Sequence, residues 1–251
     1  MHQYFLRLPI WLMCVAGPSI ALSAEAHVAV AANFAEPIKA IAAVLEKTTG
    51  HQLHITLGAT GKLYAQIKND APFDVLLAAN TQTPDQLQKD SLVQAGSRFT
   101  YATGKLALWS ADAALVDAQG EVLKRGAFRK LAYASPKLAP YGEAAVQVMQ
   151  SLGLSAALAP KLVQGESIGQ TYNFVYTGNA ELGFVALSQV LQGAKLKSGS
   201  VWIVPQTFYT PIRQDAVVLM RGAANPAAQA LMLLLKSPDI QHLIQSYGYG
   251  L

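Results

Sequence analysis

The alternation of strand-like and helix-like segments is the feature that most constrains the fold of this 251-residue chain. Short β-rich apolar runs are followed by segments with apolar residues at helical spacing, as at Ile38, Ile41 and Leu45. The order strand, helix, strand, helix, strand runs from residue 27 to residue 89, and a second series starts at Leu131. This order predicts an α/β protein made of two parallel sheets with helices on their faces.

The length is sufficient for two lobes of about 100 residues each. The helical segments after Pro226 are too few to form a unit of their own, so we expect them to pack back on the first lobe. The chain would then cross between the lobes twice, near Leu106 and near Arg213, and two crossings make a hinged cleft. The expected lobes are residues 27–106 plus 213–251, and residues 107–212.

The N-terminus has the pattern of a secretory signal peptide. A weakly basic start is followed by an apolar run to Leu22, and then by Ala24-Glu25-Ala26, a small-x-small cleavage pattern. An N-terminal membrane anchor is the alternative, but the run is shorter than the roughly 20 residues that a membrane span needs. The sequence predicts a signal peptide over residues 1–26, cleaved after Ala26 or after Ala24, and an exported protein.

Composition excludes several classes of protein. Half of the chain is hydrophobic, only 14% is charged, and the lysines and arginines are scattered, which argues against disorder and against a polybasic nucleic-acid binder. The single cysteine, Cys14, lies in the predicted signal peptide, so no disulfide framework is expected. No zinc-protease motif is present, and no carboxylate follows His51 or His54 at ligand spacing. The short pattern G-x-S-x-G occurs at residues 165–169 (GESIG), but this pattern alone does not make an active site. We therefore expect no enzyme and no metal site.

Residues 58–62 (GATGK) join a strand to a helix and resemble a phosphate-binding loop. A Walker A loop needs a longer spacing and a Ser or Thr after the lysine, where this chain has Leu63. The backbone N–H groups of Thr60, Gly61 and Lys62 would still lie in the first helical turn, where free N–H groups and the helix dipole favour an anion. In the alternative interpretation Thr60 only caps the helix.

The same arrangement recurs at three other strand-to-helix turns. Asn33 follows the first strand, Tyr141 lies in the turn Pro140-Tyr141-Gly142, and Ile168 lies between Ser167 and the next helix. Asn33 is also a residue type that caps helices, so capping is again the alternative. In open α/β sheets ligands bind at the carboxyl ends of the strands. Apart from Lys62 these turns carry no basic residue, so the sequence predicts a small anion held mainly by neutral donors.

Five segments carry a resemblance to a known family: residues 28–34, 57–80, 135–145, 163–172 and 177–190. In order, and over nearly all of the chain after the signal peptide, they resemble the periplasmic molybdate-binding proteins of bacterial ABC importers. The resemblance implies a two-lobed "Venus flytrap" of the periplasmic-binding-protein fold, which binds molybdate or tungstate without a cofactor. It further implies a periplasmic protein, a membrane permease as partner, a monomer and no nucleic-acid binding.

The resemblance also implies four oxyanion-binding residues. Asn33 and Thr60 fall where the family has side-chain donors, often serines, and Tyr141 and Ile168 fall where it offers backbone N–H groups. Some members place a tyrosine two residues after the Gly-Phe of a late strand, where this chain has Ala186. The missing hydroxyl is either supplied by Tyr141 or absent.

Three other functions are conceivable for a two-lobed fold of this kind. A binding protein of the same fold for sulfate, phosphate or a small organic acid remains the alternative, because the sequence shows neither the cavity size nor the number of donors. Porphobilinogen deaminase shares the two-lobed architecture but needs a cysteine for its cofactor, and none remains after the signal peptide. A ligand-sensing domain of a transcription factor would need a DNA-binding motif where the signal peptide lies.

Overall fold

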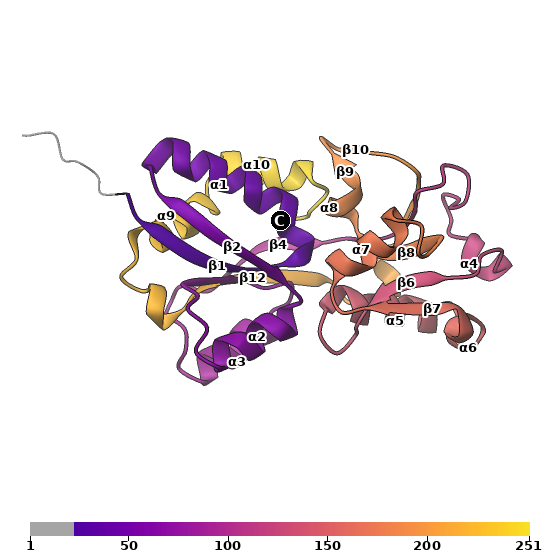
Figure 1. Ribbon diagram of the computed structural model, residues 1–251, viewed down its shortest axis with the longest axis horizontal. Coiled ribbons are helices and arrows are strands. Elements are labelled where there is room, and N and C mark those ends of the chain that lie inside the picture. The colour runs from indigo at the N-terminus through magenta and orange to yellow at the C-terminus, as the bar shows by residue number, and fades with distance from the viewer. Residues whose placement is uncertain (1–22) are drawn as a thin grey trace, which may run out of the picture.

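The structure of the protein is a computed structural model that describes residues 23–251, so most of the predicted signal peptide lies outside the described residues. Two five-stranded sheets of mostly parallel strands, each flanked by helices, form two lobes that lie side by side along the long axis (Figure 1). This is the two-lobed α/β architecture that the alternation of strands and helices predicts.

The first sheet has the strand order β2-β1-β3-β12-β4. Strands β1, β2 and β3 are parallel, and β12 is antiparallel to both of its neighbours, β3 and β4. The strands are β1 (Glu25–Ala31), β2 (Gln52–Gly58), β3 (Val75–Leu77), β4 (Phe99–Gly104) and β12 (Ile212–Val218).

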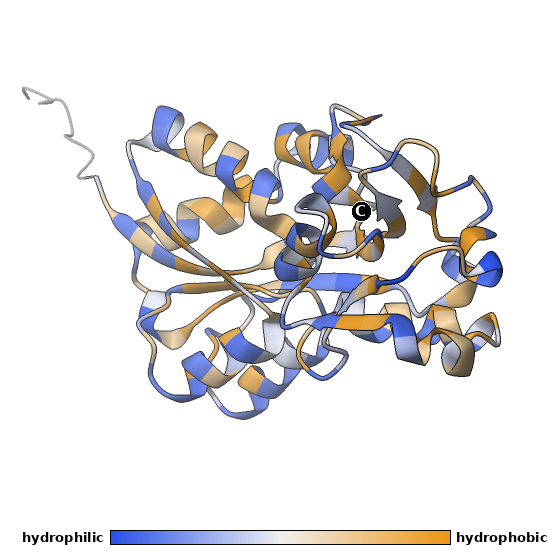
Figure 2. Cartoon of the chain, turned by 45° about the vertical axis from the view of Figure 1, so that its right-hand side comes forward, coloured by the Kyte–Doolittle hydropathy of each residue, from blue (hydrophilic) through white to orange (hydrophobic). Residues whose placement is uncertain are grey.

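Helices cover both faces of this sheet because its buried strands are apolar on both sides. Val28 and Val30 pack with one set of helices, and Ala29, between them in β1, packs with the other. Figure 2 shows that hydrophobic residues dominate the inner strands, whereas hydrophilic residues are interspersed along the helices. On the first face lie α1 (Ala35–Thr49), α9 (Pro226–Leu234) and α10 (Pro238–Ser246), and on the second lie α2 (Thr60–Lys68) and α3 (Gln82–Lys89).

The second sheet repeats the topology of the first. Its order is β11-β5-β8-β6-β7, in which β6, β7 and β8 are parallel and β5 is antiparallel to β8 and β11. The strands are β5 (Leu106–Ser110), β6 (Leu131–Ala134), β7 (Leu162–Gly165), β8 (Leu182–Ala186) and β11 (Ser200–Ile203).

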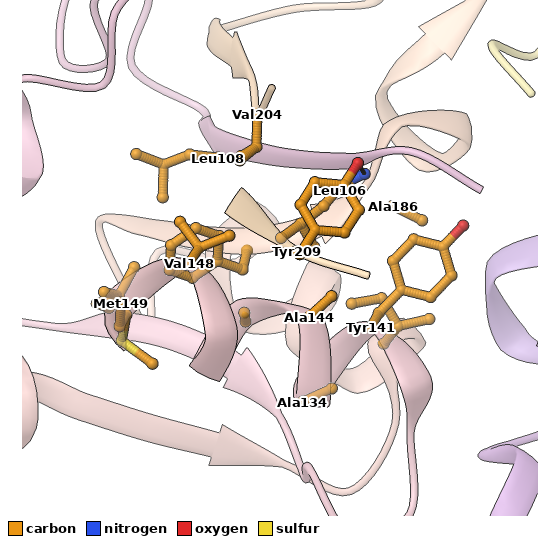
Figure 3. Close-up of a cluster of buried hydrophobic side chains, with 14 of the residues drawn as sticks. Leu106, Leu108, Ala134, Tyr141, Ala144, Val148, Met149, Ala186, Val204 and Tyr209 are labelled. Atoms are coloured by element: carbon orange, nitrogen blue, oxygen red, sulfur yellow. Dashed lines mark hydrogen bonds between the residues drawn. The ribbon is translucent and has the colours of Figure 1, made fainter. Parts of the chain in front are cut away.

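Two helices cover the faces of the second sheet. Helix α5 (Pro140–Ser151) packs Ala144 and Val148 against Leu106 and Leu108 of β5 (Figure 3). Helix α7 (Ile168–Tyr176) packs on the opposite face. The remaining elements are short: α4 (Val122–Arg125), α6 (Ser155–Leu158), α8 (Leu187–Val190), the hairpin β9 (Leu191–Gln192) and β10 (Lys195–Leu196), and the 3-10 helices η1 (Ala32–Phe34), η2 (Ala159–Lys161), η3 (Gln206–Phe208) and η4 (Met220–Gly222).

The one antiparallel strand of each sheet is the strand by which the chain enters that lobe. The chain passes from the first sheet to the second between β4 and β5, and returns between β11 and β12. The parallel strands run toward the other lobe, so a strand that arrives from that side must run in the opposite direction. None of the helices within residues 23–251 is long and apolar enough to cross a membrane.

Two parts of the first sheet differ from the sequence-based expectation. Strand β4 was not expected, because FTYATG alternates only weakly between apolar and polar residues. The segment before Ala216 is polar in sequence, yet it belongs to β12, where Gln214 and Asp215 are almost fully buried. Each has polar partners: the Gln214 amide bonds three tyrosine or asparagine side chains, and the Asp215 carboxylate bonds Arg98 and Thr100.

The start of β1 allows a test of the two expected cleavage sites. Glu25 and Ala26 pair with β2, Ala26 is fully buried, and the carbonyl of Glu25 accepts a hydrogen bond from Asn225 at 2.8 Å. A chain that begins at His27 loses these contacts. We expect it to be about 1–2 kcal/mol less stable in urea unfolding than a chain that begins at Glu25. Equal stabilities would show that the first two residues of β1 contribute nothing.

Gly142 allows helix α5 to approach the end of β6. A Cβ at this position would lie 2.2 Å from the carbonyl oxygen of Ala134, so the backbone would have to move. We expect Gly142→Ala to lower the free energy of unfolding by about 1–3 kcal/mol, as overpacking does. Gly250→Ala is the control, because its Cβ would meet the nearest atom at 3.6 Å, an ordinary contact. Urea unfolding of both variants measures the difference.

Candidate functional site

A small cavity lies between the two lobes, with a volume of about 10 Å³, close to that of one water-sized sphere. All four predicted site residues line it, and no charged residue does. Its lining residues follow the carboxyl ends of strands in both sheets. They are Ala31, Ala32, Asn33, Gly58, Ala59, Thr60 and Ala79 from the first lobe, and Ala139, Pro140, Tyr141 and Ile168 from the second.

Three helices begin at this cavity and direct backbone donors toward it. Thr60 and Ile168 are the first residues of α2 and α7, and Tyr141 is the second residue of α5. N–H groups at these positions have no acceptor within their own helix and lie at the positive end of its dipole. Within residues 23–251 no other acceptor takes a hydrogen bond from them. The cavity wall therefore offers donors that carry no net charge.

The Thr60 side chain is buried, and its hydroxyl acts as a hydrogen-bond acceptor but not as a donor within the protein. Its hydroxyl oxygen accepts a hydrogen bond from the backbone N–H of Ala79 at 3.1 Å. The residue that caps α2 is Ala59, and no side chain bonds the end of that helix. The capping interpretation of Thr60 is therefore wrong, and its hydroxyl hydrogen is available to an acceptor in the cavity.

Asn33 does not cap a helix either. Its Nδ2 donates to Oε1 of Gln214 at 2.9 Å and to the hydroxyl of Tyr249 at 3.0 Å. Neither η1 nor α1 has a side-chain cap. Its Oδ1 is the one buried side-chain nitrogen or oxygen of the described residues that has no hydrogen-bond partner. Asn33 thus lines the cavity as a side chain whose hydrogen bonds are only half satisfied.

Behind Asn33 lies a buried network that the sequence analysis missed. Oε1 of Gln214 also accepts from the hydroxyl of Tyr101 at 3.0 Å, and its Nε2 donates to the hydroxyl of Tyr141 at 3.2 Å. The Tyr249 hydroxyl donates to the backbone carbonyl of Asn33 at 2.8 Å. Burial raises the pKa of Tyr101, Tyr141 and Tyr249 above that of an exposed tyrosine, so all three phenols stay neutral at physiological pH.

The position of Ala186 contributes no hydroxyl to the site. Its methyl group is fully buried in the apolar cluster of the second lobe. The Tyr141 ring lies at the edge of the same cluster, and its hydroxyl points away from the apolar side chains (Figure 3). That hydroxyl accepts the hydrogen bond from Gln214, so it belongs to the network between the lobes.

Direct contacts hold the lobes together around the cavity. The N–H of Gly61, expected to face the anion, instead donates to the carbonyl of Leu138 in the other lobe at 2.9 Å. The Ser188 hydroxyl donates to the backbone carbonyl of Asn33 at 2.9 Å. An open cleft of about 780 Å³ adjoins the cavity and shares Asn33 with it.

Lys62, the one basic residue of the four turns, forms an ion pair across the lobes with Glu166 at 2.5 Å. Both side chains are exposed to a large extent, and Lys62 does not line the cavity. Its amine is therefore engaged outside the cavity, unlike the lysine of a phosphate loop. Among the described residues, no group of three or more His, Cys, Asp and Glu side chains could hold a metal ion.

Comparisons with known proteins identify the family of the chain. The family model of the bacterial extracellular solute-binding proteins matches residues 26–250. The chain is 58% identical to the molybdate-binding protein ModA of Azotobacter vinelandii, over 92% of both chains, and 49% identical to that of Rhodobacter capsulatus, over 91% of this chain and 89% of the relative. The solved structure of the periplasmic molybdate-binding protein of Azotobacter vinelandii superimposes with a TM-score of 0.87 and 41% identity, over 90% of this chain and 99% of that one. The chain therefore belongs to the family of bacterial extracellular solute-binding proteins.

Proposed function

We propose that this protein binds molybdate or tungstate in the periplasm and delivers it to the membrane permease of an ABC importer. The observation that carries the proposal is the uncharged cavity between the lobes, where donors from both lobes converge. The relatives named for molybdate binding support the identity of the ligand.

Neutral donors suit a ligand that must be both held tightly and released. Each hydrogen bond to a charged group contributes about 1.5–3 kcal/mol, so a few aligned donors hold a dianion without a cation in the cavity. The four proposed ligand residues are Asn33 and Thr60 in the first lobe, and Tyr141 and Ile168 in the second. Asn33 and Thr60 act through side chains, and Tyr141 and Ile168 act through backbone N–H groups.

Binding and release would require the lobes to move, because the cavity is lined by residues of both lobes and an anion in it is fully enclosed only when the lobes meet. We propose that the two lobes, one built on the first sheet and one on the second, open as two bodies and close again on the ligand. Its differential contacts with the closed state would drive closure. In this role the protein acts as a monomeric carrier without catalysis, cofactor or nucleic-acid partner, after export and removal of the signal peptide.

Calorimetric titration with molybdate, tungstate, sulfate and phosphate tests the proposal. Molybdate and tungstate should bind at least roughly a hundredfold more tightly than sulfate and phosphate, because a smaller anion leaves some fixed donors poorly paired, at about 1–3 kcal/mol each. Sulfate affinity equal to that of molybdate would favour the alternative, a binding protein of this fold for another small anion. No heat with any of the four anions would refute oxyanion binding altogether.

Thr60 provides a test of one ligand residue. Thr60→Val keeps the shape of the side chain but removes the hydroxyl, and we expect molybdate affinity to fall by about 10–100-fold, the value of one hydrogen bond to a charged group. Thr60→Ser keeps the hydroxyl and should stay close to the parent affinity. If the valine variant binds as tightly as the serine variant, the Thr60 hydroxyl does not contact the ligand.

A further inference from the structure

The unpartnered Oδ1 of Asn33 is at odds with an anion site. Asn33 lines the cavity, and both hydrogens of its Nδ2 are used inside the protein, by Gln214 and Tyr249. Oδ1 is buried and accepts nothing. A carbonyl oxygen accepts hydrogen bonds and cannot donate them. In this orientation the Asn33 side chain therefore offers no hydrogen-bond donor to an oxyanion, and its carbonyl oxygen repels the negative charge.

We propose that Gln214 is the positioning residue that decides which end of the Asn33 amide faces the ligand, and that both amides turn over when the oxyanion binds. The proposal rests on the proposed function, because it assumes an anion in the cavity. It assigns a role in recognition to a residue that does not itself line the cavity.

Turning both amides satisfies every group of the network. The Nδ2 of Asn33 then donates to the anion, and its Oδ1 takes the former place of Nδ2, where Nε2 of Gln214 can donate to it. The single hydrogen of the Tyr249 hydroxyl can also turn to Oδ1, because the Ser188 hydroxyl still donates to the backbone carbonyl of Asn33. Nε2 of Gln214 also donates to the Tyr101 hydroxyl, whose single hydrogen then goes to the carbonyl of Ala78, 3.2 Å away, instead of to Oε1 of Gln214. The Oε1 of Gln214 then accepts from the Tyr141 hydroxyl. No buried atom remains without a partner, whereas the unturned arrangement leaves Oδ1 alone.

The position of Gln214 suits this role. It is fully buried in β12, between Asn33 of its own lobe and Tyr141 of the other. Gly104 makes the room for this contact, since a Cβ there would lie 2.6 Å from Nε2 of Gln214 and 2.0 Å from the Tyr141 hydroxyl. The Gln214 amide therefore couples closure of the second lobe to the orientation of the Asn33 side chain in the first lobe, because it bonds both Tyr141 and Asn33.

Gln214→Glu tests the role, because an ionised carboxylate only accepts hydrogen bonds and must keep Nδ2 of Asn33 turned away from the ligand. Near pH 8 this variant should bind molybdate at least roughly a hundredfold more weakly than the parent. Affinity should recover as the pH falls toward 6, because burial raises the pKa of a carboxyl group and its neutral form can donate to Oδ1. The parent should show no such slope, since the phenols around Gln214 stay neutral and the neighbouring Asp215 is paired with Arg98.

Two controls separate orientation from simple charge repulsion. Gln229→Glu makes the same change at a glutamine of the same lobe that bonds Gln94 and Ala223 instead of the site, and it should leave binding unchanged. In an Asn33→Ser background there is no amide to turn, so adding Gln214→Glu should cost much less than it costs in the parent. An equal cost in both backgrounds, or no pH slope in Gln214→Glu, overturns the positioning role while leaving oxyanion binding intact.

A measurement on the unaltered protein covers the case in which Gln214→Glu does not fold. Neutron diffraction from a deuterated crystal of the molybdate complex distinguishes the nitrogen of an amide from its oxygen. The proposal predicts that the deuterated Nδ2 of Asn33 faces the anion and that Nε2 of Gln214 donates to Oδ1. A complex in which Asn33 still donates to Oε1 of Gln214 would refute the turn. Failure of the unaltered protein to bind molybdate would count against the proposed function instead.

Discussion

The carboxyl ends of the parallel strands in both sheets point at one cavity, and most of the structure depends on that arrangement. The turns that follow β1, β2, β3, β6 and β7 line the cavity, and α2, α5 and α7 begin at it. The same arrangement fixes the direction of the entering strands, β5 and β12, which have to run against their neighbours. The position of the cavity and the two crossings of the chain between the lobes thus both follow from the strand order that the two sheets share.

The cavity is lined by backbone N–H groups and a hydroxyl, which are dipoles, and not by a cationic side chain, which would attract an anion more directly. The backbone N–H groups at helix starts are fixed by the fold, so they lose little freedom on binding an anion, and their hydrogen bonds are stronger in the low dielectric of a protein interior than in water. The nearby cation, Lys62, is engaged by Glu166 at the exposed edge of the lobes. Neutral phenols and amides behind the cavity complete a wall that adds no fixed charge of its own.

The sequence predicts the fold and the cavity lining well, because both depend on local patterns. Alternating strands and helices determine the two sheets, and residues after strand ends, such as Thr60 and Ile168, come together because parallel strands end at the same edge. The polar stretch around Gln214 gives no such signal, since a buried polar strand is recognised only through partners far away in the chain. Tyr249 reaches Asn33 across 216 residues, and neither the orientation of an amide nor the repeated strand order of the two sheets leaves a periodic trace in the sequence.

Strand β12 lies between β3 and β4, although the chain reaches it only after the whole second lobe. The second sheet, by contrast, is built from the continuous segment between Leu106 and Ile203. Contacts between residues far apart in the sequence form late, because closing the long loop between them loses conformational entropy before the contact contributes any favourable free energy. The second lobe can thus complete its sheet early in folding, while β3 and β4 keep open edges that could pair with another chain. For the first lobe, the interval before β12 inserts is therefore the period in which these edges are exposed to aggregation.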